Sequence, residues 1–93
     1  MKIIWSATAT RDLDEVVRYV AQDSVASALQ VQDRILSASD RLAELPLRGR
    51  PGRLSGAREL VVARTSCLIV YAVSDDRIDI LRIMHGAREW PLE

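Results

Sequence analysis

Residues 58–90 read RELVVARTSCLIVYAVSDDRIDILRIMHGAREW, and this stretch decides the fold of the chain. Three runs rich in Val, Ile and Leu, at 59–64, 67–73 and 77–84, are separated by two short polar turns. Short β-branched runs with such turns are typical of antiparallel strands joined by tight connections. The middle run is apolar at almost every position, which predicts a strand covered on both faces.

The outer runs of this meander alternate in polarity, so each strand is expected to have two different sides. For the third run the alternation predicts Ile78, Ile80 and Met84 on one side and Asp79, Leu81 and Ile83 on the other. Arginines recur through the same stretch, and we expect the sheet to display them as a cationic face: Arg58, Arg64, Arg77, Arg82 and Arg88.

Length and composition indicate one globular domain spanning residues 1–93, with 48% hydrophobic and 28% charged residues. No apolar run approaches the ~20 residues of a membrane-spanning helix, so no membrane association is expected. The first residues become polar and acidic too soon for a secretory signal. The single cysteine, Cys67, has no internal disulfide partner and is expected to be a small buried hydrophobe, which favours a cytoplasmic protein.

The formal net charge of zero conceals an uneven distribution of charge. Twelve of the thirteen cations are arginines, and most of the arginines lie in the second half of the chain. Arginine pairs with carboxylate or phosphate through two-point contacts, which suits an anionic partner. A GC-rich genome would produce the same bias without any functional reason, and both explanations stay open.

The first half of the chain predicts a strand followed by two helices. Residues 2–5 form a short apolar run, and Ser6, Thr8 or Thr10 can cap a helix that ends near residues 22–23. A second helix is expected from Ser24 to Leu45, stopped by Pro46. Its apolar positions are spaced three and four apart, and we expect them to pack on the sheet: Ala28, Val31, Ile35, Ala38, Leu42 and Leu45. The predicted fold is therefore α+β, in the order β-α-α-β-β-β, with an antiparallel helical hairpin packed on a small, mainly antiparallel, twisted sheet.

Residues 46–57, PLRGRPGRLSGA, contain two of the three prolines and three of the four glycines. This composition predicts an exposed loop. Its three arginines either contact an anionic partner or keep the connection soluble.

Most sites for chemistry lack the residues that they require. One His and one Cys do not form a metal-ligand set, there is no phosphate-binding glycine motif, and no cofactor is expected. With four aromatic residues, the chain is also poorly supplied with stacking platforms for single-stranded RNA.

Five short motifs extend along the whole chain. They are S-x-x-A-x-x-D-L at 6–13, Pro46 after the long helix, REL at 58–60, LIVY at 68–71 and ILRIMHGAR at 80–88. Together with the order of elements, they resemble the RelE/ParE superfamily of bacterial type II toxins, and the ParE branch most closely.

This resemblance implies a small cytoplasmic toxin that is neutralised by direct binding of a cognate antitoxin. ParE-like toxins are taken to inhibit DNA gyrase by stabilising its cleaved-DNA state, which blocks replication, whereas RelE-like relatives cut messenger RNA on the ribosome. The antitoxin is expected to bring an acidic, partly disordered segment to a groove between helices and sheet or to an unpaired sheet edge, in a toxin–antitoxin hetero-oligomer.

The site residues differ between the two activities. A nuclease would use His85 as the proton-transfer group, with Arg64, Arg82 and Arg88 holding phosphate. A gyrase inhibitor needs only a contact surface, for which the candidates are Arg58, Arg64, Arg82, His85, Arg88 and Trp90. We favour binding over catalysis, since a tyrosine or lysine of the kind RelE-like nucleases use near the chain end is missing here. A stable binding module that has lost its toxicity is a third interpretation.

Overall fold

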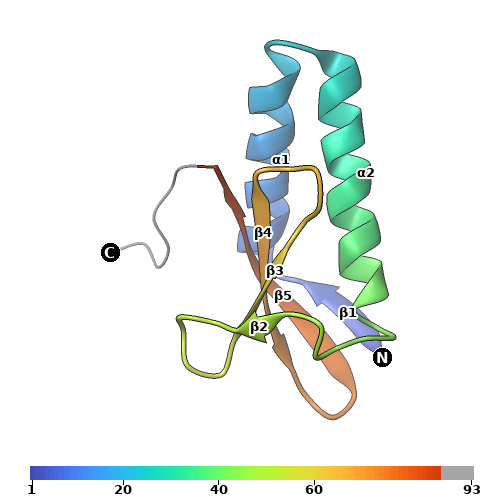
Figure 1. The fold of residues 1–93 in the computed structure, drawn as a ribbon, viewed down its shortest axis with the longest axis vertical. Coiled ribbons are helices and arrows are strands. Elements are labelled where there is room, and N and C mark those ends of the chain that lie inside the picture. The colour runs from blue at the N-terminus through green and yellow to red at the C-terminus, as the bar shows by residue number, and fades with distance from the viewer. Residues whose placement is uncertain (87–93) are drawn as a thin grey trace.

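The computed structural model describes residues 1–86 and contains a helical hairpin on one side of a five-stranded sheet (Figure 1). The strands lie in the order β1-β5-β4-β3-β2. β1 pairs in parallel with β5, and the other neighbours are antiparallel. The predicted α+β architecture is confirmed, with one additional short strand. The elements are β1 (Lys2–Trp5), α1 (Ala7–Ala21), α2 (Val25–Arg41), β2 (Arg50–Pro51), β3 (Arg58–Val61), β4 (Cys67–Val73) and β5 (Arg77–His85).

Serine side chains start both helices. The Oγ of Ser6 accepts a hydrogen bond from the N–H of Ala9, and the Oγ of Ser24 accepts one from the N–H of Ser27. Each bond satisfies one of the unpaired N–H groups at a helix N-terminus. The two helices pack side by side as an antiparallel pair, and α1 also packs on β5.

The core lies between the helices and one face of the sheet. Ile35 and Leu42 from the α2 segment meet Ile69, Tyr71 and further sheet residues, and these four side chains are fully buried. The central strand β4 is covered on both faces as predicted, because Val70 belongs to a second, smaller cluster on the opposite face with Ala57 and Met84.

The end of α2 differs from the prediction. The α-helix ends at Arg41 rather than Leu45, and residues 42–44 continue as a tighter turn in which each N–H bonds the carbonyl three residues back. Leu45 consequently leaves the apolar stripe and is 57% exposed. Pro46 therefore follows this turn and does not itself terminate the α-helix.

The predicted faces of β5 are correct before Leu81 and wrong after it. Leu81 has no partner on β4, since Ile80 pairs with Tyr71 and Arg82 pairs with Val70, which makes a β-bulge. One extra residue in a strand reverses the alternation that follows it. Ile83 therefore joins the core beneath the helices, and Met84 lies on the helix-free face.

Candidate functional site

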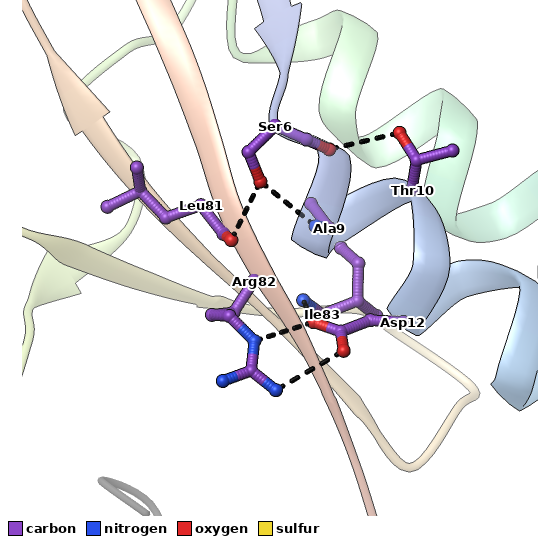
Figure 2. A network of polar contacts seen from close by, with 7 residues as sticks. All are labelled: Ser6, Ala9, Thr10, Asp12, Leu81, Arg82 and Ile83. Carbon is purple, nitrogen blue, oxygen red and sulfur yellow. Dashed lines mark hydrogen bonds and ion pairs between the residues drawn. The ribbon is translucent and has the colours of Figure 1, made fainter.

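The bulge in β5 lies just beyond the part of β5 that pairs with β1. At the bulge the neighbour of β5 is the first half of α1 (Figure 2). The backbone N–H of Ser6 donates to Ile80 O at 3.0 Å, and its hydroxyl donates to Leu81 O at 3.0 Å. The N–H of Ile83 donates to the Asp12 carboxylate, also at 3.0 Å. Ser6 and Asp12 thus supply the polar partners that a neighbouring strand would otherwise provide.

The same carboxylate holds Arg82 through two hydrogen bonds. Arg82 Nε donates to Asp12 Oδ2 at 2.7 Å, and Nη2 donates to Oδ1 at 3.2 Å. The Asp12 side chain is 9% exposed and the Arg82 side chain 25%. The hydrogen bond that Arg82 donates to Asp12 raises the pKa of Arg82 above its usual value, against a smaller opposing effect of burial. Arg82 is therefore a charged, internally paired side chain rather than a free cation.

His85, at the end of β5, lines a cavity of about 670 Å³ next to α1. Its ring meets the edge of Tyr19, with the ring centroids 5.5 Å apart and the planes at 64°. Among residues 1–86 the lining includes the carboxylates of Asp12 and Glu15 but no lysine or arginine. Within the described part of the chain the cavity is thus acidic, and its potential general acid–base groups are His85, Tyr19 and Glu15.

Of the remaining predicted site residues, the two in the described part of the chain lie away from His85. Arg58 donates to Gly49 O at 2.7 Å and so supports the loop before β2. Arg64 has a positive φ of 63° in the turn after β3 and lines a different cavity, beside α2. Within residues 1–86, Arg58, Arg64 and Arg82 thus occupy separate places and do not form one cationic face. Arg88 and Trp90 lie outside the described residues.

Glu59 is paired with the loop before β3. It accepts from Arg50 Nη2 at 3.3 Å and from the backbone N–H of Arg53 at 3.0 Å. Successive strand residues point to opposite faces, so Arg58 and Glu59 point apart. Glu59 is 3% exposed and anchors the arginine-rich loop to the sheet.

The helix-free face of the sheet carries an apolar cluster beside charged side chains, because Asp79, the register partner of Ile4, lies on this face and pairs with Arg77. Leu68 and Leu81 pack there against the buried cluster of Ala57, Val70 and Met84. Ile4 lies on the same face, because its neighbours Ile3 and Trp5 both pack in the main core, and it is 39% exposed.

The site residues that sequence reasoning missed are Asp12, Glu15 and Tyr19. In the sequence Asp12 appears only as a position of the S-x-x-A-x-x-D-L motif, and Glu15 and Tyr19 have no assigned role. Asp12, Glu15 and Tyr19 are three and four residues apart, and this spacing places them on one side of α1. The spacing is the feature of the sequence from which a shared site could have been predicted. Nothing local indicated that β5 would be their neighbour.

Comparison with known protein families shows to which family this chain belongs. The family model described as the ParE toxin of the type II toxin–antitoxin system parDE matches residues 3–90, which is nearly the whole chain. The chain belongs to the ParE toxin family. It is thus a toxin of the type II class, as the sequence motifs predicted.

Relatives of this ParE-family toxin carry both ParE and RelE names. It is 43% identical to Y4kP of Sinorhizobium fredii, covering 97% of this chain and 93% of the relative. It is 38% identical to Toxin RelE2 of Caulobacter vibrioides, covering 94% and 97%. The solved chromosomal ParDE system of P. aeruginosa contains a chain that matches with a TM-score of 0.82 at 28% identity, covering 91% of this chain and 95% of that one. These names do not separate gyrase inhibition from RNA cleavage.

Neither a metal-binding cluster nor a membrane-spanning helix is present in residues 1–86 of the ParE-family chain. Residues 1–86 contain no group of three or more His, Cys, Asp or Glu side chains placed to hold a metal ion. Within the same residues, neither helix has the length and apolar character to cross a membrane.

Proposed function

We propose that this ParE-family toxin acts by binding DNA gyrase and stabilising its cleaved-DNA state, and that a cognate antitoxin neutralises it by direct binding. The observation that carries the choice of target is the pairing of Arg82 with Asp12. The pairing neutralises Arg82, which lies three residues before His85, and commits its Nε and Nη2 to the Asp12 carboxylate rather than to a phosphate.

Phosphoryl transfer requires cations around the reacting phosphate, in addition to groups that move protons. In the His85 cavity the described lining supplies two carboxylates and no arginine or lysine. Asp12 and Arg82 neutralise each other, so Glu15 is the carboxylate of the described lining that would repel a phosphodiester. This charge arrangement favours a toxin that acts by contact over one that cleaves RNA.

The helix-free face of the sheet supports the same proposal. Its apolar side chains include the part-exposed Ile4 and the half-buried Leu68 and Leu81. A part-exposed apolar surface is suited to burial against another protein, whereas recognition of single-stranded RNA relies on stacking rings. We therefore assign the helix-free face as the surface that meets gyrase.

The proposed antitoxin partner is supported by the assemblies in which similar chains occur. The P. aeruginosa match comes from a ParDE toxin–antitoxin system, and a second fold match comes from the RelBE2 toxin–antitoxin complex of Mycobacterium tuberculosis. We extend this assembly to the present chain, with a hetero-oligomer of toxin and antitoxin as the expected inactive form.

One observation favours an RNA-cleaving alternative. His85 and Tyr19 are in ring contact at a common cavity, and an imidazole beside a phenol is a workable pair for proton transfer. In that alternative His85 is essential, whereas in the gyrase proposal it only helps to pack the end of β5 against α1.

The deciding experiment is incubation of the purified chain with DNA gyrase, ATP and supercoiled DNA, followed by denaturation and electrophoresis. We expect linear DNA to accumulate, and we expect His85→Ala to produce nearly as much of it. Ile4→Glu on the helix-free face should reduce the product strongly, and Leu29→Glu on the exposed side of α2 is the matched control.

A different set of products would support the nuclease. Cleaved messenger RNA in a ribosomal translation reaction, abolished by His85→Ala and accompanied by no linear DNA, would replace the gyrase proposal with the nuclease. Absence of both products, together with normal growth of bacteria expressing the chain, would identify a binding module without toxicity.

A further inference from the structure

A second cavity, of about 300 Å³, lies between α2 and the end of β3. Four arginines from three parts of the chain line it: Arg34 and Arg41 from α2, Arg48 from the loop before β2, and Arg64 from the turn after β3. Asp33 is the sole carboxylate among its described lining residues. We call this cavity the arginine groove.

Within residues 1–86 no carboxylate lies within ion-pair distance of the four groove arginines. The described ion pairs involve five other arginines: Arg18, Arg50, Arg53, Arg77 and Arg82. Like charges held close together repel one another unless solvent or a bound anion compensates them. The groove therefore has the charge of an anion-binding site.

The groove arginines form two pairs, one at each end of the groove. Arg34 and Arg41 are seven residues apart on α2, which places their backbones about 10 Å apart. Arg34 Nη1 donates to Arg64 O at 3.2 Å, so Arg64 lies at the Arg34 end. Arg48 lies at the other end, because its N–H donates to Leu45 O and the N–H of Leu45 donates to Arg41 O. An anion that contacts both pairs needs negative charges spaced by about 10 Å.

The surroundings of the groove combine exposed charge with a buried apolar side. Arg41, Arg48 and Arg64 are exposed, whereas Leu60 and Val62 of the lining are buried. An apolar wall strengthens the field of neighbouring charges, because it excludes the water that would screen them. Cationic side chains continue beyond the groove, since residues 46–57 contain three arginines and no carboxylate. The surface therefore suits an anion that is longer than the groove itself.

We propose that the arginine groove binds the phosphate backbone of double-stranded DNA, and that in the gyrase reaction this DNA is the duplex that the enzyme holds. The inference rests on the proposed gyrase target. Phosphates follow one another about every 3.4 Å along each strand of a duplex, so about three nucleotide steps span the distance between the two pairs of arginines. Each guanidinium holds a phosphate through two-point contacts.

The DNA contact explains how this chain stabilises a complex of gyrase and DNA. A ligand shifts an equilibrium only as far as its affinities for the two states differ. The apolar cluster of the helix-free face and the lining of the groove have no residue in common, so gyrase and DNA occupy separate surfaces of the chain. Two contacts made by one chain reinforce each other, because the second forms at a high effective concentration. The chain therefore binds the gyrase–DNA complex more tightly than either component alone.

A duplex accounts for these features better than an acidic peptide does. Its phosphates are already spaced at fixed distances, whereas a disordered peptide loses conformational entropy when it is ordered in a groove. Duplex DNA is also present wherever gyrase acts. With a net charge of zero and about four phosphate contacts, the chain is expected to bind free DNA weakly and without sequence preference.

The test measures binding of a short fluorescent DNA duplex to the full chain by anisotropy, in roughly 50 to 200 mM salt. We expect the logarithm of the binding constant to fall with the logarithm of the salt concentration with a slope of about −3 to −4. Arg41→Gln combined with Arg48→Gln should weaken binding by about tenfold at the lowest salt and make the slope shallower by about 2. Lys2→Gln combined with Arg11→Gln removes the same charge at exposed positions outside the groove and should leave the slope unchanged.

The gyrase reaction provides the second measurement. The groove variant should yield several-fold less linear DNA than the unsubstituted chain, and the control variant should yield as much as the unsubstituted chain. Circular dichroism of both double variants establishes that they are folded.

The outcomes separate this inference from the gyrase proposal. Absence of duplex binding, an equal loss in both double variants, or binding of polyglutamate in place of the duplex would overturn the DNA site. Equal yields of linear DNA from the groove variant and the unsubstituted chain would remove the groove from the gyrase reaction and leave the gyrase target standing. Duplex binding with the expected arginine dependence, but without linear DNA, would support the groove as a DNA site and remove gyrase as the target.

Discussion

Asp12 illustrates how one side chain can serve several parts of the molecule. It lies in the second turn of α1, yet it neutralises Arg82 and satisfies the N–H of Ile83, both about seventy residues away in sequence. The carboxylate is almost fully buried, so each of these groups would lose its partner without gaining full access to water if Asp12 were removed. The S-x-x-A-x-x-D-L motif therefore has a structural explanation: Ser6 and Asp12 join α1 to the bulge, and Ala9 is small enough to be completely buried between them and the core.

We predict that Asp12→Ala lowers the free energy of unfolding by about 2–4 kcal/mol. Urea denaturation followed by circular dichroism measures this change. Asp12→Asn keeps an acceptor for the N–H of Ile83 but loses the charge, so its effect should be intermediate.

The control for this prediction is Asp14→Ala on the same helix. Asp14 pairs with Arg18 at 3.1 Å, but both side chains are more than half exposed. Exposed pairs contribute about 0.5 kcal/mol or less. Similar losses for Asp12→Ala and Asp14→Ala would show that the bulge network contributes no more than a surface ion pair.

The arginine-rich segment between α2 and β3 is held to the sheet at specific points, although its composition predicted an open loop. Tyr71 of β4 is fully buried, donates to Pro46 O at 2.9 Å and accepts from the N–H of Gly49 at 2.8 Å. Gly49 approaches so closely that an added Cβ would lie 2.7 Å from the Tyr71 hydroxyl oxygen. Together with Glu59, this contact turns part of the loop into the short strand β2 and places Arg48 beside α2.

Tyr71→Phe should therefore loosen the segment while leaving the core volume nearly unchanged. We expect a loss of about 1–2 kcal/mol in the free energy of unfolding, because Gly49 N–H and Pro46 O lose their partner. Trypsin should also cut more quickly after Arg48 and Arg53 in the native protein. Tyr19→Phe, at a site 63% exposed, is the control. Unchanged cleavage rates in Tyr71→Phe would show that the tyrosine does not restrain the loop.

One continuous core connects both helices with four of the five strands, and a second small cluster lies on the helix-free face. It contains residues from both helices and from β1, β3, β4 and β5. Because neither the hairpin nor the sheet can bury its apolar face alone, both should unfold in the same transition.

Ile35→Ala in α2 tests this cooperativity, since Ile35 is fully buried between the hairpin and the sheet. We expect a loss of about 2–5 kcal/mol, with the helix signal and tryptophan fluorescence changing at the same urea concentration. Leu29→Ala lies on the same helix at 56% exposure and should cost no more than about 0.5 kcal/mol. Separate transitions for the two signals would contradict a single cooperative core.

The sequence by itself determined the features that depend on local periodicity and local chemistry. The bounds of β1 and β4, the stripe of α2 up to Leu42 and the fold class follow from the spacing of apolar residues and from residues that suit helix starts and turns. Ser6 was one of three candidate caps for the first helix, and the structure selects it. Those preferences act over a few residues and need no knowledge of distant neighbours. The same motifs were sufficient to predict the family.

Two features depend on the tertiary structure: which arginines are left without an internal carboxylate, and which side chains of β5 enter the core after the bulge. An ion pair between Asp12 and Arg82, the support of Arg58 by loop carbonyls and the gathering of Arg34, Arg41, Arg48 and Arg64 all depend on contacts between segments that are remote in the chain. The bulge at Leu81 also leaves no periodic signal, because a single extra residue resembles ordinary strand sequence until a partner strand and Asp12 hold it in place. Charge in a sequence becomes a binding surface only after folding has paired some groups and left others unpaired.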